Sequence, residues 1–512
     1  MSLLSFRYTF LAATVLAVTV LSLVGCDTLS ENPNSGKTFE QATSSVSEIQ
    51  TATIGNYGLV SGNTMYRSYP TLLMYMGEIS GDNLMMSVTT PNPLQQNFTY
   101  DRSVTMGNAE TVWQHTYQII YSTNQAVIGL NRLLEGGNLT EQERTQAEQL
   151  KGENLFLRAK TYHDAVRLFG RPYPQNPEQN LGVPLVDSTD TGAEPPRATV
   201  AEVYDQIVQD LEQASELMTM QKSNGYASTE AAWAVLSRVY LYMEENQKAI
   251  DYANRVIDSG RFELLATADY PSYWRMSPEE NTETIFALHR EENQAFGNGS
   301  FPSMFYTSPG GNGYGEIFAS EELRDLFAEY PADVRDVFIE PQYVVENGDT
   351  LRNEDGSPVV SQRNGFDRYF MTKCTYQQGI PLLCSPVYIR LAEMYLNRAE
   401  AYAKLGMEQK ALADVNRIRQ RAGLDGEALY SRSNLHGLDS VLDAVLQERR
   451  LELYHEGHRS FDIFRNGRAL ERGYPSVIAG NLTIEPSAEN VVYPIPRSAI
   501  QRNSNLEQNP GY

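Results

Sequence analysis

The sequence is poor in the residues that build metal centres and disulfide scaffolds. Its 512 residues include 3 Cys, 6 His and 3 Trp. Three cysteines are too few for a disulfide-rich scaffold or for a metal cluster built from cysteine. The six histidines are scattered, which argues against a histidine-rich metal site. We therefore expect no metal and no cofactor.

Basic residues are scarce relative to acidic ones. Lys and Arg together number 41 and Asp and Glu 64, which gives a formal net charge of −23. A surface this acidic repels phosphate backbones, so nucleic acid is excluded as a partner on electrostatic grounds. Hydrophobic residues nevertheless make up 41 % of the chain and charged residues 21 %. That composition supports a buried core and excludes a mainly disordered chain.

Long apolar runs are lacking except at the N-terminus. Residues 9–25 are almost wholly apolar or small, and Arg7 precedes them, a pattern typical of a signal peptide. No other run predicts a membrane-spanning helix in the mature protein. The run ends in Leu23-Val24-Gly25-Cys26, which resembles the lipobox of bacterial lipoproteins and predicts acylation of Cys26. The alternative is an ordinary secretory signal, residues 1–25, with an incidental cysteine.

The polar segment after this cysteine, residues 26–47, predicts a flexible tether between the lipid and the folded domain of residues 48–512. Export also sets the redox environment of the two remaining cysteines. In an oxidising compartment a disulfide between Cys374 and Cys384 would close a small loop, whereas two free thiols are the alternative.

Hydrophobic periodicity predicts a mostly α-helical fold. Apolar residues at spacings of three, four and seven recur through much of the chain, and Thr199 with Glu202 forms a capping-box signature. The predicted helices cover about residues 108–135, 140–169, 200–217, 228–245, 247–259, 387–405, 407–422 and 438–456.

Two of the predicted helix pairs repeat one another at an offset of 162 residues. Tyr240 with Gln247-Lys248-Ala249-Ile250 corresponds to Tyr402 with Gln409-Lys410-Ala411-Leu412. Each pair is typical of a tetratricopeptide hairpin, in which a Tyr and an Ala pack together across the turn. Chance similarity between Ala-rich helices is the alternative. The offset predicts a large insertion between the hairpins, over residues 261–386.

This insertion and residues 58–105 are predicted to be loop-rich, carried by helical hairpins over about residues 108–260 and 387–470. Both are irregular in pattern and contain many aromatic residues. Long loops on a rigid scaffold are where binding residues usually lie.

Several segments in chain order together resemble the SusD/RagB family of outer-membrane lipoproteins from Bacteroidota. Each segment alone is weak, but their order from residue 26 to residue 512 is specific. They are the lipobox with Leu29-Ser30-Glu31-Asn32-Pro33; Trp113, Tyr117, Ile120 and Asn124; Gly152-Glu153 with Phe156-Leu157-Arg158-Ala159; Leu168-Phe169-Gly170 and Gly182-Val183-Pro184-Leu185; Arg197-Ala198-Thr199-Val200; Tyr388-Ile389-Arg390-Leu391-Ala392-Glu393 with Asn397-Arg398-Ala399-Glu400-Ala401; Glu448-Arg449-Arg450 with Glu456-Gly457-His458-Arg459; Tyr493-Pro494-Ile495-Pro496; and Gln508-Asn509-Pro510-Gly511-Tyr512.

The resemblance implies a non-enzymatic protein with a tetratricopeptide-type helical scaffold and a loop-rich ligand-binding face. It implies a lipid-anchored protein at the outer membrane, facing the exterior. Such a protein would capture a nutrient, an oligosaccharide or a peptide, and deliver it to a SusC-type TonB-dependent transporter. An exported glycoside hydrolase and a tetratricopeptide adaptor are the alternatives from other classes.

Six loop residues are the candidates for ligand contact. Sugars stack their apolar faces on aromatic rings, while planar polar side chains fix the hydroxyl groups. The candidates of both kinds are Tyr273, Trp274, Tyr306, Tyr314, Asp82 and Asn83. Each ring could instead pack within its loop, and Gly81-Asp82-Asn83 could be only a turn.

A cluster of charged residues near the C-terminus has two interpretations. Mixed charges recur at helical spacing from residue 448 to residue 465, which favours a structural salt-bridge network over a catalytic acid and base. Within it, His455-Glu456-Gly457-His458 resembles a zinc-protease motif only superficially, because its histidines are three residues apart rather than four.

Overall fold

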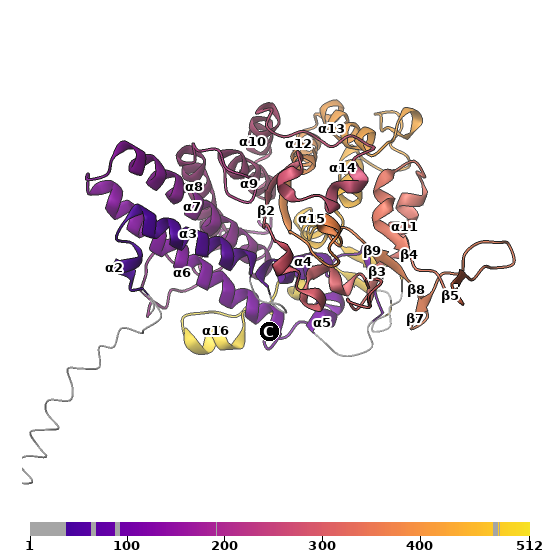
Figure 1. Ribbon diagram of the computed structural model, residues 1–512, viewed down its shortest axis with the longest axis horizontal. Coiled ribbons are helices and arrows are strands. Elements are labelled where there is room, and N and C mark those ends of the chain that lie inside the picture. The colour runs from indigo at the N-terminus through magenta and orange to yellow at the C-terminus, as the bar shows by residue number, and fades with distance from the viewer. Residues whose placement is uncertain (1–36, 63–67, 88–92, 191, 475–479, 481) are drawn as a thin grey trace, which may run out of the picture.

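The computed structural model describes residues 37–62, 68–87, 93–190, 192–474, 480 and 482–512 (Figure 1). The predicted signal peptide and Cys26 lie outside the described residues. Within the described part of the chain, no helix is both long enough and apolar enough to cross a membrane.

Helices dominate the fold, as the periodicity predicts. Their bounds are α2 (Phe39–Ala42), α3 (Val46–Ser61), α4 (Tyr69–Glu78), α5 (Pro93–Thr99), α6 (Gly107–Glu135), α7 (Glu141–Phe169), α8 (Val200–Leu217), α9 (Thr229–Tyr242), α10 (Asn246–Asp258), α11 (Glu321–Ala328), α12 (Leu391–Lys404), α13 (Glu408–Arg421), α14 (Val441–Leu453), α15 (Arg459–Arg465) and α16 (Arg497–Arg502). The predicted helices of the scaffold are confirmed to within a few residues. The exceptions are residues 387–390, which form a strand, and residues 454–456, which follow the end of α14.

The long helices pack in succession along the chain. α6 contacts α7, α7 contacts α8, α8 contacts α9, and α9 contacts α10. α10 then packs directly on α12, although the whole insertion separates them in sequence. α12, α13 and α14 complete the scaffold. The helices before the insertion, α6 to α10, and those after it, α12 to α14, lie side by side in Figure 1.

The two repeated hairpins have the same turn. Glu245 donates its backbone N–H to the Tyr240 carbonyl at 2.9 Å, and Met407, 162 residues later, donates to the Tyr402 carbonyl at 2.8 Å. The preceding residues, Glu244 and Gly406, both have a positive φ, of 61° and 72°. Both turns therefore use one left-handed residue, which glycine accepts more readily than glutamate does. The predicted internal repeat is confirmed.

Short two-stranded antiparallel sheets and 3₁₀ turns occupy the insertion and three segments outside it, around residues 84–86, 387–390 and 470–484. The strands are β1 (Leu84–Met86), β2 (Thr284–Ala287), β3 (Ile317–Ala319), β4 (Ile339–Pro341), β5 (Val345–Glu346), β6 (Asp349–Thr350), β7 (Gln362–Arg363), β8 (Phe366–Asp367), β9 (Tyr369–Met371), β10 (Val387–Arg390), β11 (Leu470–Arg472) and β12 (Leu482–Ile484). The pairs are β1–β3, β2–β10, β4–β9, β5–β6, β7–β8 and β11–β12. Strands β5 to β8 form an arm that projects from the body at the right of Figure 1.

Two segments differ from the sequence-based expectation. The last residues of the predicted tether are structured, because Thr38 and Gln41 form a capping box for α2 and α3 begins at Val46. The segment 58–105, predicted as loop-rich, contains α4 and α5. α4 is buried around most of its circumference, so its sequence lacks the polar stripe that reveals an amphipathic helix.

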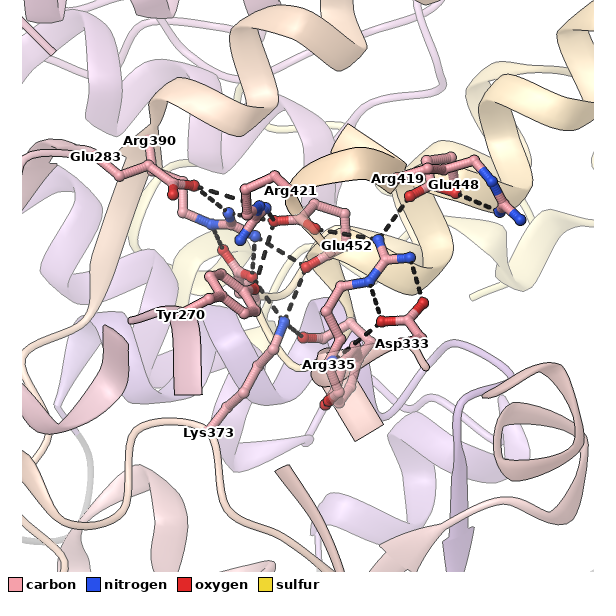
Figure 2. Close-up of polar contacts among 12 residues, drawn as sticks. Tyr270, Glu283, Asp333, Arg335, Lys373, Arg390, Arg419, Arg421, Glu448 and Glu452 are labelled. Atoms are coloured by element: carbon pink, nitrogen blue, oxygen red, sulfur yellow. Dashed lines mark hydrogen bonds and ion pairs between the residues drawn. The ribbon is translucent and has the colours of Figure 1, made fainter. Parts of the chain in front are cut away.

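A buried ionic network joins the insertion to the helical scaffold (Figure 2). Arg335 of the insertion contacts Glu448 and Glu452 of α14 at 2.6 and 3.2 Å, and Asp333 at 2.6 Å. Arg390 of β10 contacts Glu452 at 2.5 Å. These side chains are almost inaccessible to water, so each charge relies on its partner for compensation. The structural interpretation of the charged cluster is confirmed.

Candidate ligand-binding groove

A groove of about 900 Å³ lies along the described residues. One side is α3, with Ile54, Tyr57 and Ser61, and another is the first half of α6, with His115 and Gln118. The remaining sides are three loop segments: residues 225–226, Glu279, and residues 289–294. A groove of this size is typical of small-molecule sites in proteins.

The groove continues past Tyr226 into a second hollow of about 270 Å³. Ile54, Tyr57 and Tyr226 line both hollows. Ile54 is 57 % exposed and Tyr226 37 % exposed. Ile54 and Tyr226 therefore lie where the two hollows meet. An elongated ligand that occupied both hollows would contact them.

Tyr226 is held in place by the ring of Tyr57. The two ring centroids lie 5.1 Å apart with an interplanar angle of 75°, the edge-to-face geometry that aromatic pairs prefer. The Lys222 Nζ lies 4.9 Å from the Tyr226 centroid on the same loop. Because its position is fixed before a ligand arrives, the ring would lose little conformational freedom on binding.

The hydroxyl of Tyr57 anchors the backbone of the same loop. It accepts a hydrogen bond from the backbone N–H of Ala227 at 2.9 Å and donates to Glu153 of α7 at 3.0 Å. Burial, together with the neighbouring Glu153 carboxylate, raises the pKa of Tyr57 well above its ordinary value. The phenol therefore stays protonated and keeps its donor role at physiological pH.

The opposite side of the groove is fixed from behind by Arg290. Its guanidinium donates to the Ser61 carbonyl at the end of α3, at 3.1 Å, and to Ser68 Oγ, at 3.2 Å. Its backbone N–H donates to Ser385 Oγ at 2.8 Å. Ser385 directly follows Cys384, and the structure joins Cys384 to Cys374 by a disulfide. The disulfide loop thus supports the segment 289–294.

Imidazole and amide side chains also line the groove. The buried Nδ1 atoms of His115 and His289 have no hydrogen-bond partner among the described residues. Partial burial lowers the pKa of His115, which favours its neutral form. Gln118 and Asn293 are exposed beside these rings. Neutral imidazole and amide groups can both donate to and accept from sugar hydroxyl groups.

Asp82 and Asn83, predicted as ligand contacts, are buried. Asp82 receives two hydrogen bonds from Arg459, at 2.6 and 2.8 Å, and Asn83 accepts one from Arg450 at 2.8 Å. Burial opposes ionisation of Asp82, but Arg450 and Arg459 hold its pKa below the ordinary value. Both side chains are occupied in joining the α4–β1 segment to α14 and α15, so the expectation that they face a ligand is corrected.

Tyr273 and Trp274 also lie inside the protein. They belong to the 3₁₀ turn Tyr270–Arg275 and are 3 % and 7 % exposed. The Tyr273 hydroxyl lies 2.8 Å from Thr284 Oγ1, and the Lys373 Nζ lies 5.7 Å from the Trp274 ring centroid. The expectation of a solvent-facing aromatic pair is wrong here, because the turn folds both rings against the buried ionic network.

Tyr306 and Tyr314 have different surroundings. Tyr306 is 8 % exposed, packs on Phe370 at 5.5 Å and hydrogen-bonds Tyr376. Tyr314 is 43 % exposed, and its carbonyl accepts a hydrogen bond from Arg363. Tyr314 is thus the one predicted ring that presents a broad surface to water within the described part of the chain.

No pattern in the sequence marks the residues that line the groove. They come from segments around residues 54–61, 115–118, 225–226 and 289–294, which no single motif connects. Tyr57 and His115 lie on helices, and a residue in a predicted helix is first interpreted as part of the core. The one local signal was Ser223-Asn224-Gly225-Tyr226, a turn sequence that ends in an aromatic residue.

The catalytic interpretation of the C-terminal charged cluster has no support in the geometry. Glu452 contacts Arg335, Arg390 and Arg421, and these cations hold its pKa well below the ordinary value despite burial. Glu456 of the superficial zinc motif is paired with Lys373 and Arg390. Within the described residues, no group of three or more His, Cys, Asp and Glu side chains could hold a metal ion.

Comparison with known proteins places this architecture in a family. The sequence model of the "SusD family" matches residues 384–512, and a model described as "Starch-binding associating with outer membrane" matches residues 36–241. The chain is 26 % identical over 519 residues to SusD-like protein P2 of Formosa agariphila, covering 97 % of this chain and 98 % of that protein. It is 24 % identical to the starch-binding protein SusD of Bacteroides thetaiotaomicron, covering 72 % and 74 % of the two chains.

Solved structures agree with the sequence matches. A SusD superfamily protein from Bacteroides vulgatus superposes with a TM-score of 0.77 at 29 % identity, covering 91 % of this chain and 99 % of that one. The similarity thus includes both the helical scaffold and the insertion. The chain belongs to the SusD/RagB family, whose members are non-catalytic binding proteins associated with the outer membrane.

Proposed function

We propose that this protein is a surface-exposed lipoprotein that binds an oligosaccharide in the α3 groove and delivers it to a SusC-type TonB-dependent transporter. The observation that carries the proposal is the groove itself, with a pre-positioned ring, Tyr226, at its junction. A sugar ring stacks its apolar face on such an aromatic surface, and nearby amide and imidazole groups bind its hydroxyl groups.

The family relationship supports a carbohydrate over a peptide. One matching family model is described as starch-binding, and one relative is named a starch-binding protein. The groove also combines aromatic and aliphatic side chains with polar ones, as carbohydrate recognition requires. Acylation at Cys26 and attachment to the outer membrane complete the proposal, because delivery requires the protein to stay beside the transporter.

Titration calorimetry tests this function. The full chain, in a detergent without a sugar headgroup, is titrated with a panel of oligosaccharides and short peptides, and the mixtures are analysed for products. We expect saturable heat with an oligosaccharide and no cleavage. Tyr226→Ala should lower the affinity at least about tenfold, as loss of a central aromatic contact usually does.

Tyr343→Ala is the matched control. Tyr343 is 42 % exposed, close to the value for Tyr226, but lies beside the arm of β5 to β8. Its removal should leave the affinity unchanged. Saturable binding of a peptide alone would replace the sugar in the proposal, and cleavage products would overturn the binding function in favour of an enzyme.

A further inference from the structure

The described sides of the groove carry carboxylates and no cation. Glu279 and Glu291 both line it, and both are exposed. Each is followed in the chain by a second exposed glutamate, Glu280 and Glu292. No Lys or Arg is among the residues that the structure describes along this groove. The described lining is therefore acidic, like the chain as a whole.

Two described cations adjoin the groove, and both have partners. Lys222, in the adjoining hollow, is ion-paired with Glu153. Arg290 is 2 % exposed and donates to the Ser61 carbonyl and to Ser68 Oγ, behind the groove. Burial lowers the pKa of Arg290 to about 10. Arg290 therefore presents no accessible charge to the groove, and the charge of Lys222, in the adjoining hollow, is offset by Glu153.

We propose that Glu279 and Glu291 are specificity-determining residues that exclude glycans carrying sulfate or carboxylate groups. The ligand is then an uncharged or amine-bearing glycan. This inference rests on the proposed function, because it assigns a substrate class to the same groove.

The chemical reason is the acceptor-only character of ionised carboxylates. A carboxylate accepts hydrogen bonds and donates none, so it pairs well with a sugar hydroxyl or ammonium group. Sulfate and uronate groups are acceptor-only as well, so no hydrogen bond forms between them and either glutamate. Their charges also repel, and this repulsion extends over about 8–10 Å at moderate salt.

The test compares three forms of one oligosaccharide: unmodified, sulfated and amine-bearing. The full chain is titrated with each at low and at high salt, in the detergent described above. We expect the sulfated form to bind at least about tenfold more weakly than the unmodified form at low salt. The difference should narrow at high salt, because the repulsion between exposed charges is screened.

Removal of the carboxylates should allow sulfated glycans to bind more tightly. Glu279→Gln with Glu291→Gln keeps two hydrogen-bond acceptors but removes two negative charges. At about two- to fivefold for each exposed charge, the double variant should bind the sulfated form roughly four- to twenty-five-fold more tightly than the parent does. The readout is the ratio of its affinities for the unmodified and sulfated forms, which should fall even if hydrogen bonds from sugar hydroxyl groups weaken as well. Glu346→Gln, on the projecting arm, is the matched charge control and should change neither affinity.

The outcomes separate this inference from the proposed function. Equal or tighter binding of the sulfated form by the parent protein would overturn the exclusion while leaving glycan binding intact. An unchanged preference in the double variant, with a native circular dichroism spectrum, would overturn the role of the two glutamates. If none of the glycans bound, the proposed function and this inference would both fail.

Discussion

The ring of Tyr226 stands edge-to-face against the ring of Tyr57, with their centroids 5.1 Å apart. Tyr57 is a buried residue of α3, whereas Tyr226 is an exposed residue of a loop more than 160 positions later in the chain. This contact therefore holds the ring of Tyr226, a loop residue, against the helical scaffold. A ligand that stacks on Tyr226 meets a surface that is already in position, which favours affinity without new folding.

Tyr57→Phe tests how this position is maintained. The substitution keeps the ring but removes the hydroxyl that accepts from the Ala227 N–H and donates to Glu153. Buried partners would be left unpaired, so the free energy of unfolding should fall by about 1–3 kcal/mol. Oligosaccharide affinity should weaken several-fold because the Tyr226 loop is less restrained. Denaturant unfolding and calorimetric titration measure the two effects.

Tyr226→Phe is the companion variant. It retains the ring that contacts the ligand and Tyr57, so stability and affinity should stay close to those of the parent protein. A loss of affinity in Tyr226→Phe as large as in Tyr226→Ala would show that the hydroxyl rather than the ring face makes the contact.

The disulfide should stabilise both the protein and the groove. Replacing both Cys374 and Cys384 by Ala opens a short loop, which should lower the free energy of unfolding by roughly 2–3 kcal/mol. Because Ser385 holds the backbone of Arg290, the segment 289–294 should also become more mobile. Oligosaccharide affinity should therefore fall in the folded double variant. Unchanged affinity would show that the disulfide loop does not support the groove.

Stability should decline in mild acid because His163 is buried and neutral. Burial, with the nearby cationic side chains of Arg167 and Arg238, lowers its pKa well below the ordinary value of 6.5. An unfolded histidine takes up a proton below about pH 6.5 while the folded one resists, so protons favour the unfolded state. One such group costs about 2 kcal/mol of stability at pH 5 relative to pH 7.

His163→Phe removes this contribution and suits the site. The imidazole lies edge-to-face with Tyr204 and Tyr242, and neither of its nitrogens has a partner among the described residues. The variant should lose less stability than the parent between pH 7 and pH 5, as measured by thermal unfolding across that range. An equal loss of stability between pH 7 and pH 5 in the two proteins would refute the role of His163.

Arg335→Met tests the ionic network that joins the insertion to α14. It would leave the buried carboxylates of Asp333, Glu448 and Glu452 without one of their cations. Removal of one partner from a buried ion pair typically costs about 3–5 kcal/mol. Arg432→Met is the control, because Arg432 pairs with Glu408 on the exposed surface, and such pairs contribute at most about 1 kcal/mol. Equal losses from the two variants in denaturant unfolding would contradict the proposed importance of burial.

Local signals in the sequence accounted for most of the scaffold. Periodic apolar residues and capping pairs such as Thr199 with Glu202 predict helix type and bounds, and the structure confirms that capping box. The repeat at an offset of 162 predicted two equivalent hairpins, and their turns have the same hydrogen bonds. The buried α4 was missed because nearly all its side chains face protein, so no polar stripe marks it.

The groove could not be predicted because it has no local signature. Its residues come from α3, α6 and loops far apart in the chain, and only the tertiary fold brings them together. Aromatic richness was a poor guide to exposure: Tyr273 and Trp274 lie in a turn with Pro271 but are covered by the insertion itself. Asp82 was similarly ambiguous, since a carboxylate after a glycine suits a ligand site, a turn or a buried ion pair.

Hydrogen exchange of the full chain, with and without a saturating oligosaccharide, tests the central claim most directly. If the ligand lies in the α3 groove, the backbone amides of residues 225–227 and 289–294 should become protected together. Amides on the arm of β5 to β8 should not change. Protection confined to the arm, or to the loop around Tyr314 with none in the groove, would contradict the account.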